Sequence, residues 1–266
     1  MEERNMKIIV CVKQVPDTTE VKLDPKTGRL IRDGVPSIIN PDDKNALEEA
    51  LRIKDSHPGS TVIVVSMGPP QADVAMREAL AMGADEAYLI CGREFAGSDT
   101  WATSYIIATA IKKIPDYDII FCGRQAIDGD TAQVGPQIAE QLNIPQITYV
   151  QDLKIEGDKV IAQRQLEDGY TVVEAKMPVL LTAIKELNEP RYMTPSGIFD
   201  AYKKEVTVWG FADVPVDVEK IGLKGSPTNV NKTFSPEAKG QGIMLEGADK
   251  ATVKTLVDYL DEKHLL

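Results

Sequence analysis

The sequence contains few of the residues that most often carry metal or acid–base chemistry. Its 266 residues include two histidines, His57 and His264, and three cysteines that form no Cys-x-x-Cys pair. This scarcity argues against a zinc site, a disulfide framework and a serine–histidine hydrolase. The chain also lacks an apolar run approaching the roughly 20 residues that cross a bilayer. We therefore expect a soluble, cytoplasmic protein with no metal and no membrane insertion.

Positive charge is scarce as well. Thirty Lys and Arg residues stand against 41 Asp and Glu residues, which gives a formal charge of −11 and a pI of about 4.8. This balance argues against nucleic acid or an anionic membrane as a partner. The sequence has neither a GxGxxG motif after a strand nor a GxxxxGK[ST] motif, so ordinary Rossmann and P-loop chemistry are not expected. A nucleotide site in this chain needs another kind of loop.

Hydrophobic periodicity predicts a doubly wound α/β domain with a parallel sheet. Short runs rich in Val and Ile show little polar alternation, as expected of strands that are buried on both faces. Helical patterns fall between these runs, which is the alternation of such folds. Asn40 and Pro41 form a start signal for the first helix, and Gly83 is expected to end the second. The predicted strands are 7–12, 61–66, 87–90, 118–122 and 146–150, and the predicted helices are 42–55, 71–82, 99–113 and 131–142.

The character of the sequence changes after residue 151. Three further segments resemble antiparallel strands that extend the sheet, with EGD and EDG as turns. From residue 188, prolines interrupt the apolar pattern until an amphipathic helix is predicted at 249–260. We therefore divide the chain into an α/β domain at 1–187 and an extended loop and arm at 188–266. The arm has too little core of its own and must pack on another surface, such as another chain. The three segments are 159–165, 170–176 and 179–184.

The most informative segment is CGRQAIDGDTAQVGPQIAEQL at 122–142. It starts at the carboxyl end of a predicted strand, where ligands bind in open α/β sheets, and it enters a helix near Thr131. The free N–H groups of that helix start, close backbone approach at Gly129 and the Thr131 hydroxyl all suit a phosphate. Asp128 and Asp130 would repel a phosphate unless they point elsewhere. The alternative is a plain turn in which Asp130 only caps the helix.

Two other strand ends contribute loops to the same predicted edge. GSDTWATS at 97–104 places hydroxyl residues at a helix start, although Asp99 or Ser98 would also serve there as a simple N-cap. SMGPP at 66–70 completes the rim. Three loops that converge on one edge favour a binding site more strongly than any one of them does.

Three single residues near these strand ends have two interpretations each. Cys11 and Met67 are, taken alone, more typical of core filling than of ligand contact. Arg124 suits a phosphate or a flavin, and it also suits a solvated loop position. The sequence pattern leaves both interpretations open for Arg124.

Five stretches together match one known family, and the match runs from Lys7 to the C-terminal helix. They are VCVKQVPD at 10–17, NPDDKNALEEALRIKD at 40–55, ALAMGADEA at 79–87, GRQAIDGDTAQVGP at 123–136 and NEPRY at 188–192. In these stretches the chain resembles the small (β) subunit of an electron-transfer flavoprotein. The resemblance implies an adenine-nucleotide-binding α/β fold and, as partner, an α subunit that holds a flavin. Two positions depart from the family pattern: Thr171 stands where Glu or Gln is usual, and the leucine that anchors some members to a dehydrogenase is replaced around Pro195.

The resemblance also implies a nucleotide on this chain. In ordinary members the small subunit holds AMP as a structural filler, whereas in electron-bifurcating members it holds FAD that accepts hydride from NADH. DGDTAQVGP, SDTWATS and GSPTNVNKTF at 225–234 favour the bifurcating type and FAD. The implied cofactor-binding residues are Cys11, Asn40, Asp42, Asp43, Met67, Gly68, Asp99, Thr100, Thr103, Gly123, Arg124, Gln125, Ala126, Ile127, Asp128, Gly129, Asp130, Thr131, Gln133 and Val134.

The same resemblance implies the electron partners. Electrons from NADH would divide between a low-potential acceptor, ferredoxin or flavodoxin, and the α-subunit FAD. The latter would serve a flavin dehydrogenase that resembles an acyl-CoA dehydrogenase or acts on a hydroxy acid. Because the redox chemistry belongs to the cofactor, no catalytic acid or base is expected on this chain. The terminal helix of the arm is expected to pack on the α subunit.

Overall fold

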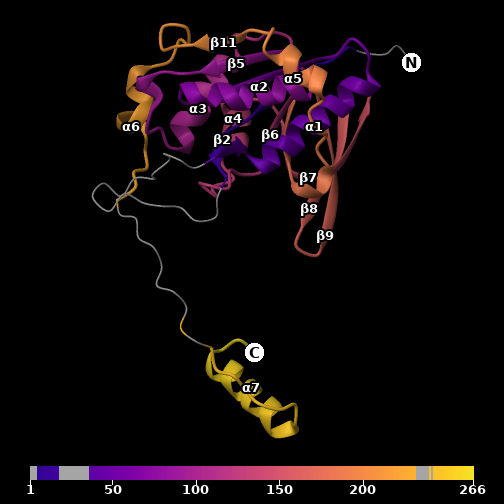
Figure 1. Cartoon of the computed structure of the whole chain (residues 1–266), viewed down its shortest axis with the longest axis vertical. Coiled ribbons are helices and arrows are strands. Elements are labelled where there is room, and N and C mark those ends of the chain that lie inside the picture. Colours follow the sequence, from indigo (N-terminus) through magenta and orange to yellow (C-terminus); the bar gives the residue numbers. More distant parts are fainter. Residues whose placement is uncertain (1–4, 18–35, 232–239, 241) are drawn as a thin grey trace. The chain divides into compact units, whose positions relative to one another are not determined.

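The computed structural model describes residues 5–17, 36–231, 240 and 242–266 (Figure 1). It divides into two compact units, residues 1–230 and residues 231–266. The larger unit is built on a nine-stranded sheet with the order β11-β5-β4-β1-β6-β10-β7-β8-β9. The strands of this sheet are β1 (Lys7–Cys11), β4 (Thr61–Met67), β5 (Glu86–Ile90), β6 (Ile119–Gly123), β7 (Gln146–Glu156), β8 (Lys159–Leu166), β9 (Gly169–Lys176), β10 (Val179–Ala183) and β11 (Val206–Trp209), and β2 (Gln14–Pro16) pairs with β3 (Ser37–Ile39) in a separate antiparallel ribbon.

Helices cover both faces of the sheet, and this confirms the doubly wound prediction. In β1, Ile8 and Val10 belong to the core beneath α1 and α2. The alternate residues, Ile9 and Cys11, belong to the core beneath α3 and α4. All four are buried, which explains why the strand is a continuous apolar run. The helices are α1 (Pro41–Ser56), α2 (Asp73–Met82), α3 (Thr100–Ile111) and α4 (Val134–Leu142), and the short 3-10 segments are η1 (Pro70–Ala72), η2 (Arg93–Phe95), η3 (Lys185–Leu187) and η4 (Val218–Lys220).

One strand pairs differently from the prediction. Segment 179–184 was expected as part of the antiparallel extension, and this expectation is wrong. β10 lies between β6 and β7 and is parallel to both of them. All five of its residues are buried, so it has the unbroken apolar run of a central parallel strand. The antiparallel extension consists of β7, β8 and β9, which pair in sequence order through the two predicted turns.

The helix that follows β6 begins later than predicted. α4 starts at Val134, three residues beyond Thr131, and its N-cap is Gln133. Asp130 and Ala132 have φ angles of 47° and 52°. These left-handed conformations cannot belong to a right-handed helix, so the chain remains a loop up to Gln133. The alternative in which Asp130 caps the helix is therefore wrong.

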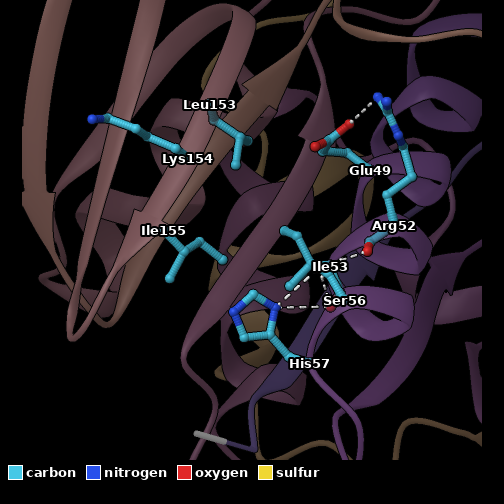
Figure 2. Close-up of a pocket in the computed structure, with 8 residues that line it drawn as sticks. All are labelled: Glu49, Arg52, Ile53, Ser56, His57, Leu153, Lys154 and Ile155. Atoms are coloured by element: carbon cyan, nitrogen blue, oxygen red, sulfur yellow. Dashed lines mark hydrogen bonds and ion pairs between the residues drawn. The ribbon is translucent and has the colours of Figure 1, made fainter. Parts of the chain in front are cut away.

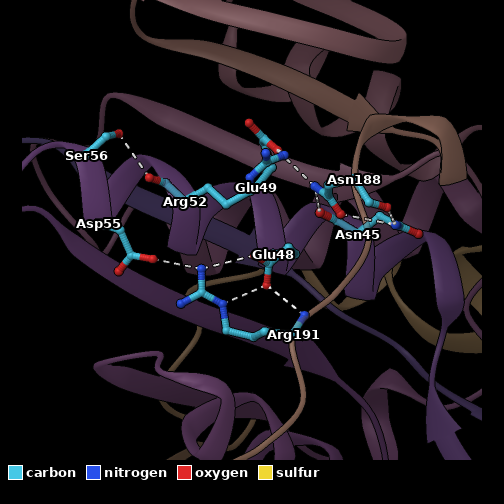
Figure 3. A network of polar contacts seen from close by, with 8 residues as sticks. All are labelled: Asn45, Glu48, Glu49, Arg52, Asp55, Ser56, Asn188 and Arg191. Atoms are coloured by element: carbon cyan, nitrogen blue, oxygen red, sulfur yellow. Dashed lines mark hydrogen bonds and ion pairs between the residues drawn. The ribbon is translucent and has the colours of Figure 1, made fainter.

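The NEPRY stretch fastens the chain after β10 to α1 (Figure 3). Arg191 donates from Nε to Glu48 Oε2 at 2.8 Å and from Nη2 to Asp55 Oδ2 at 2.8 Å. Its backbone N–H also donates to Glu48 Oε2, at 3.0 Å, and Asn188 Nδ2 donates to Glu49 Oε2 at 2.9 Å. Because the Glu48 carboxylate is buried, the Arg191 guanidinium and backbone N–H compensate for its lost hydration.

Much of the predicted arm lies inside the larger unit. α5 (Pro195–Ala201) packs on α2, and β11 pairs with β5 at the edge of the sheet. The boundary drawn at residue 187 falls within this unit, which ends at residue 230. Part of the segment from 188 onward therefore finds its surface on its own chain.

The smaller unit contains one described helix. α7 (Lys250–Glu262) is capped by Asp249, whose Oδ1 accepts from Thr252 N at 2.9 Å. None of its residues is buried, and Val253, Leu256 and Val257 are exposed. Among the described residues, no helix combines the length and apolarity that crossing a bilayer requires.

Candidate nucleotide-binding site

The candidate site lies where the direction of the sheet topology changes. β1 has β4 and β5 on one side and β6, β10 and β7 on the other. The chain moves from β1 to β4 and β5 first and then crosses back to β6, so its strand-end loops diverge between β1 and β6. In open α/β sheets such a point forms a crevice at the carboxyl ends of the strands. This is the edge at which the sequence analysis placed the nucleotide loop.

Asp43 connects the ends of the two strands that flank this point. Its Oδ2 accepts from Lys13 N at 2.8 Å, and its Oδ1 accepts from Gly123 N at 2.9 Å. Burial raises the pKa of Asp43 to about 7, although the bonds from Lys13, Asn40 and Gly123 oppose the rise. A Cβ at position 123 would collide with Asp43 and its backbone. A glycine is therefore required where β6 ends.

Asn40 attaches the loop after β6 to the start of α1. Its side chain does not cap the helix, although it occupies the predicted N-cap position. Instead, Nδ2 donates to the carbonyl oxygen of Gln125 at 2.9 Å, and Oδ1 accepts from Ile127 N at 3.0 Å. Asn40 N also donates to Lys13 O at 2.9 Å. One amide side chain thus fixes the first half of the loop.

The two loop carboxylates that would repel a phosphate are both engaged by other groups. Lys13 Nζ donates to Asp128 Oδ1 at 2.6 Å, and Gln125 Nε2 donates to Asp130 Oδ1 at 3.0 Å. The lysine partially neutralises the charge that Asp128 would otherwise present to an anionic ligand. The predicted repulsion between these two carboxylates and a phosphate is therefore reduced by their partners within the site.

Arg124 is paired rather than a free loop charge. Its Nε lies 3.3 Å from Asp42 Oδ2, an ion pair that lacks the angle of a hydrogen bond. Burial raises the pKa of Asp42, and the charge of Arg124 opposes that rise. Arg124 N also donates to Ala183 O at 2.8 Å, at the end of β10. The residue therefore holds the loop against two neighbouring elements.

The second half of the loop is open to a ligand. Residues 127–131 are exposed, and a Cβ at Gly129 would meet no atom within 4 Å. No side chain caps the start of α4. Its first N–H groups are therefore left for water or an anion, and the helix dipole favours the anion. Thr131 stands beside this helix start with an exposed hydroxyl-bearing side chain.

The start of α3 adjoins the start of α4. Thr100 Oγ1 donates to Gln133 Oε1 at 2.9 Å, which links the first residue of α3 to the N-cap of α4. Asp99 is the N-cap of α3, as the sequence suggested, and its Oδ1 accepts from Ala102 N at 3.0 Å. Two helix starts therefore share one edge of the site.

Hydrogen bonds and one ion pair connect most of the predicted residues to one another. Met67 and Gly68 lie at the end of β4, and Gly68 N donates to Ile90 O, outside this group. Cys11 lies at the end of β1 against Cys122, whose pKa is raised by the Cys11 thiol and by burial. Thr103 lies within the first turn of α3, where its N–H bonds to Asp99 O. The predicted residues that are connected to one another are Asn40, Asp42, Asp43, Asp99, Thr100, Thr103, Gly123, Arg124, Gln125, Ala126, Ile127, Gly129, Asp130 and Gln133. Asp128 is bonded to Lys13 instead.

Sequence reasoning missed Lys13 as a site residue. Lys13 lies in the VCVKQVPD stretch, but its partners Asp43 and Asp128 follow 30 and 115 positions later. Only the fold brings them together. The signal in the sequence was a single cation directly after a buried strand, at the carboxyl end where the site was expected.

A groove elsewhere on the larger unit is lined in part by charged side chains that are paired within the chain. It lies between the end of α1 and β7 (Figure 2). Arg52 is paired with Glu49 at 3.3 Å, and Lys154 is paired with Glu156 at 2.6 Å. His57 Nδ1 lies 3.1 Å from Ile53 O. Among the described residues, no group of three or more His, Cys, Asp and Glu side chains is arranged to hold a metal ion.

This geometry defines an α/β protein with a candidate ligand site at the switch point of its sheet. A family model described as "Electron transfer flavoprotein domain" matches residues 27–214. The chain belongs to the electron transfer flavoprotein family, and its relatives place it among the β subunits.

Three relatives show how close the similarity is. The chain is 61% identical over 262 residues to the electron transfer flavoprotein subunit beta of Thermoanaerobacterium thermosaccharolyticum, covering 98% of this chain and 100% of the relative. It is 58% identical over 262 residues to the caffeyl-CoA reductase-Etf complex subunit CarD of Acetobacterium woodii, also covering 98% of this chain and 100% of the relative. It is 52% identical over 269 residues to the acryloyl-CoA reductase electron transfer subunit gamma of Anaerotignum propionicum, again covering 98% and 100%. These names support a redox subunit that works within a larger complex.

Proposed function

We propose that this chain is the FAD-binding small subunit of an electron-bifurcating flavoprotein. The observation that carries the proposal is the start of α4, which no side chain caps, together with the open space at Gly129 in the preceding loop. In the same loop, Asp128 is bonded to Lys13 and Asp130 to Gln125. This arrangement leaves backbone donors for an anion and reduces the local negative charge. The similarity to a subunit of a caffeyl-CoA reductase-Etf complex and to an electron transfer subunit of an acryloyl-CoA reductase supports a role as a redox subunit.

The residues of the candidate site fit an adenine dinucleotide in separate roles. Thr131 and the first N–H groups of α4 would hold phosphate oxygens, and Thr100 would keep the two helix starts together. Asn40 and Asp43 would hold the loop and the strand ends in place, without bonding the ligand through the oxygens that they already use. When bound, FAD supplies the chemistry, accepting hydride from NADH and delivering single electrons to the α-subunit FAD and to ferredoxin or flavodoxin.

The partner of this chain in the proposal is an α subunit. α7 exposes Val253, Leu256 and Val257 and has no buried residue, so it needs a surface that the described part of its own unit does not supply. We propose that the α subunit provides this surface, and that the complex serves a flavin dehydrogenase in the cytoplasm. An ordinary small subunit with AMP in place of FAD is the alternative.

The nucleotide content of the purified αβ complex tests the proposal. We expect an acid extract to contain two FAD and no AMP per αβ pair. One FAD and one AMP per pair would contradict the bifurcating role and show that the chain is an ordinary small subunit. The Thr131→Val variant, which removes the hydroxyl but keeps the shape, should lose the small-subunit FAD first. Thr207→Val on β11, away from the site, is the matched control.

A further inference from the structure

The segment that leaves the larger unit is fastened to the start of α3. Ser98 Oγ accepts from Gly222 N at 2.9 Å, at the beginning of α6 (Gly222–Gly225). Ser226 Oγ accepts from Asp99 N at 2.8 Å and donates to Gly222 O at 2.7 Å. Ser226 is buried, so these bonds are shielded from water.

The side chain of Asp99 holds this segment at Thr228. Its Oδ1 is occupied by the N–H of Ala102, and its Oδ2 accepts from Thr228 N at 2.9 Å and from Thr228 Oγ1 at 2.7 Å. Burial would raise the pKa of Asp99, but these hydrogen bonds outweigh it and hold the pKa below its usual value. Both oxygens are therefore engaged within the chain. The smaller unit begins at Asn231, three residues after Thr228.

We propose that Asp99 is a positioning residue that anchors the chain where it leaves the α/β unit, and that it couples this anchor to the nucleotide site. The coupling follows a short series of contacts. Thr228 bonds to Asp99. Thr100, which follows Asp99 in the sequence, bonds to Gln133, the N-cap of α4. A nucleotide at the start of α4 would therefore act, through the bond between Gln133 and Thr100, on the start of α3 that holds the anchor. This step rests on the proposed nucleotide binding at α4.

Reciprocity makes the proposal measurable. If a bound nucleotide tightens the anchor, a loosened anchor must weaken nucleotide binding by the same factor. Thr228→Val removes one of the two bonds to Asp99 Oδ2 and keeps the shape of the side chain and the backbone N–H. Asp99→Asn keeps an oxygen that can cap α3 but places an NH₂ where Thr228 needs an acceptor. Neither change adds bulk.

The experiment uses the full αβ complex, depleted of nucleotide. Hydrogen–deuterium exchange of residues 226–230 is measured with and without added FAD, and FAD uptake beyond one per αβ pair is measured by equilibrium dialysis. In the wild type, FAD should slow exchange in this segment. Thr228→Val and Asp99→Asn should speed the exchange and raise the dissociation constant of the second FAD by about threefold to tenfold. Asp217→Asn, which removes a carboxylate that caps η4 in the same segment, should leave that constant unchanged.

Two results would separate the proposals. If Thr228→Val exchanges faster but takes up FAD with unchanged affinity, the contact is only structural and the coupling is wrong. If the wild type takes up no second nucleotide, neither FAD nor AMP, the proposed function fails and the coupling fails with it. A second FAD bound in the wild type, together with weaker binding in both variants and not in Asp217→Asn, supports both.

Discussion

Single buried polar residues hold the strand ends of this protein in place. Asp43 accepts hydrogen bonds from the ends of two strands. Asn40 both accepts from and donates to the loop that follows β6. Each side chain satisfies backbone groups that the sheet ladder leaves unpaired at its carboxyl edge. Removing the Asp43 carboxyl would leave the buried N–H of Gly123 without a partner, at a cost of about 1 to 3 kcal/mol.

The raised pKa of Asp43 predicts a specific dependence of stability on pH. Its pKa rises from 3.8 to about 7 on folding, so the folded state keeps a proton that the unfolded chain releases. The stabilisation is complete below about pH 4 and is lost as the pH rises toward 7. Between pH 5 and pH 7.5, we expect the wild type to lose about 2 kcal/mol of unfolding free energy relative to Asp43→Asn.

Denaturant unfolding of the αβ complex across this pH range checks the expectation. Asp43→Asn should be less stable at low pH, because one amide oxygen cannot accept both N–H groups as readily as the two oxygens of the protonated carboxyl group. Asp152→Asn, which changes an exposed carboxylate on β7, serves as the control. Parallel pH profiles for the wild type and Asp43→Asn would show that the Asp43 pKa is not raised.

The loop between β6 and α4 has a fixed half and an open half. The fixed half is held by Asn40 and Asp42, whereas Gly129 faces open space and has an ordinary φ angle. A methyl group at position 129 therefore strains nothing in the protein itself. It would only obstruct a ligand that approaches the backbone there.

Gly129→Ala separates binding from stability for this reason. We expect its unfolding free energy to stay the same or to rise slightly, by about 0.4 to 1 kcal/mol, because alanine restricts the unfolded chain. FAD affinity at the small-subunit site should fall by roughly tenfold, which corresponds to about 1.4 kcal/mol. Gly169→Ala, whose added Cβ also meets no atom within 4 Å, is the matched control. If the two variants bind FAD with equal affinity, the ligand does not approach the backbone at Gly129.

Local periodicity was sufficient for the elements but not for their pairing. The strands and helices around the site lie close to their predicted positions because each is a distinct apolar run or amphipathic pattern. β10 was misplaced because a strand buried on both faces gives no sign of its neighbours. The start of α4 was misplaced because Asp130 and Ala132 adopt left-handed conformations that ordinary propensities do not indicate.

The site contacts were only partly predictable for a related reason. The glycines and hydroxyl residues near the strand ends were found from local patterns. The partners of Asp128 and Asp99 are Lys13 and Thr228, which lie 115 and 129 positions away. No local pattern encodes a contact between segments so far apart. The fold had to be known before the loop carboxylates could be assigned to Lys13 and Gln125 instead of to a ligand.

At the scale of the whole molecule, the chain is a strongly acidic subunit with a formal charge of −11, which argues against nucleic acid as a partner. In the described part of the smaller unit, α7 has no buried residue. The candidate site lies wholly within the larger unit, on loops at the carboxyl edge of one sheet. The proposed cofactor would therefore be held by this chain, while its electrons would pass to flavins and carriers on other chains.

This arrangement predicts what NADH does to the complex without any dehydrogenase. If FAD on this subunit accepts hydride, its phosphates are held at α4 while its ring stays accessible to nicotinamide. Rapid mixing of the αβ complex with excess NADH should then bleach the flavin absorbance. Thr131→Val should slow this bleaching much more than it changes the absorbance of the α-subunit flavin, and Thr207→Val should not slow it. A wild-type absorbance that stays constant for minutes at excess NADH would show that the chain is a carrier subunit, because hydride would then reach its flavins only through a dehydrogenase.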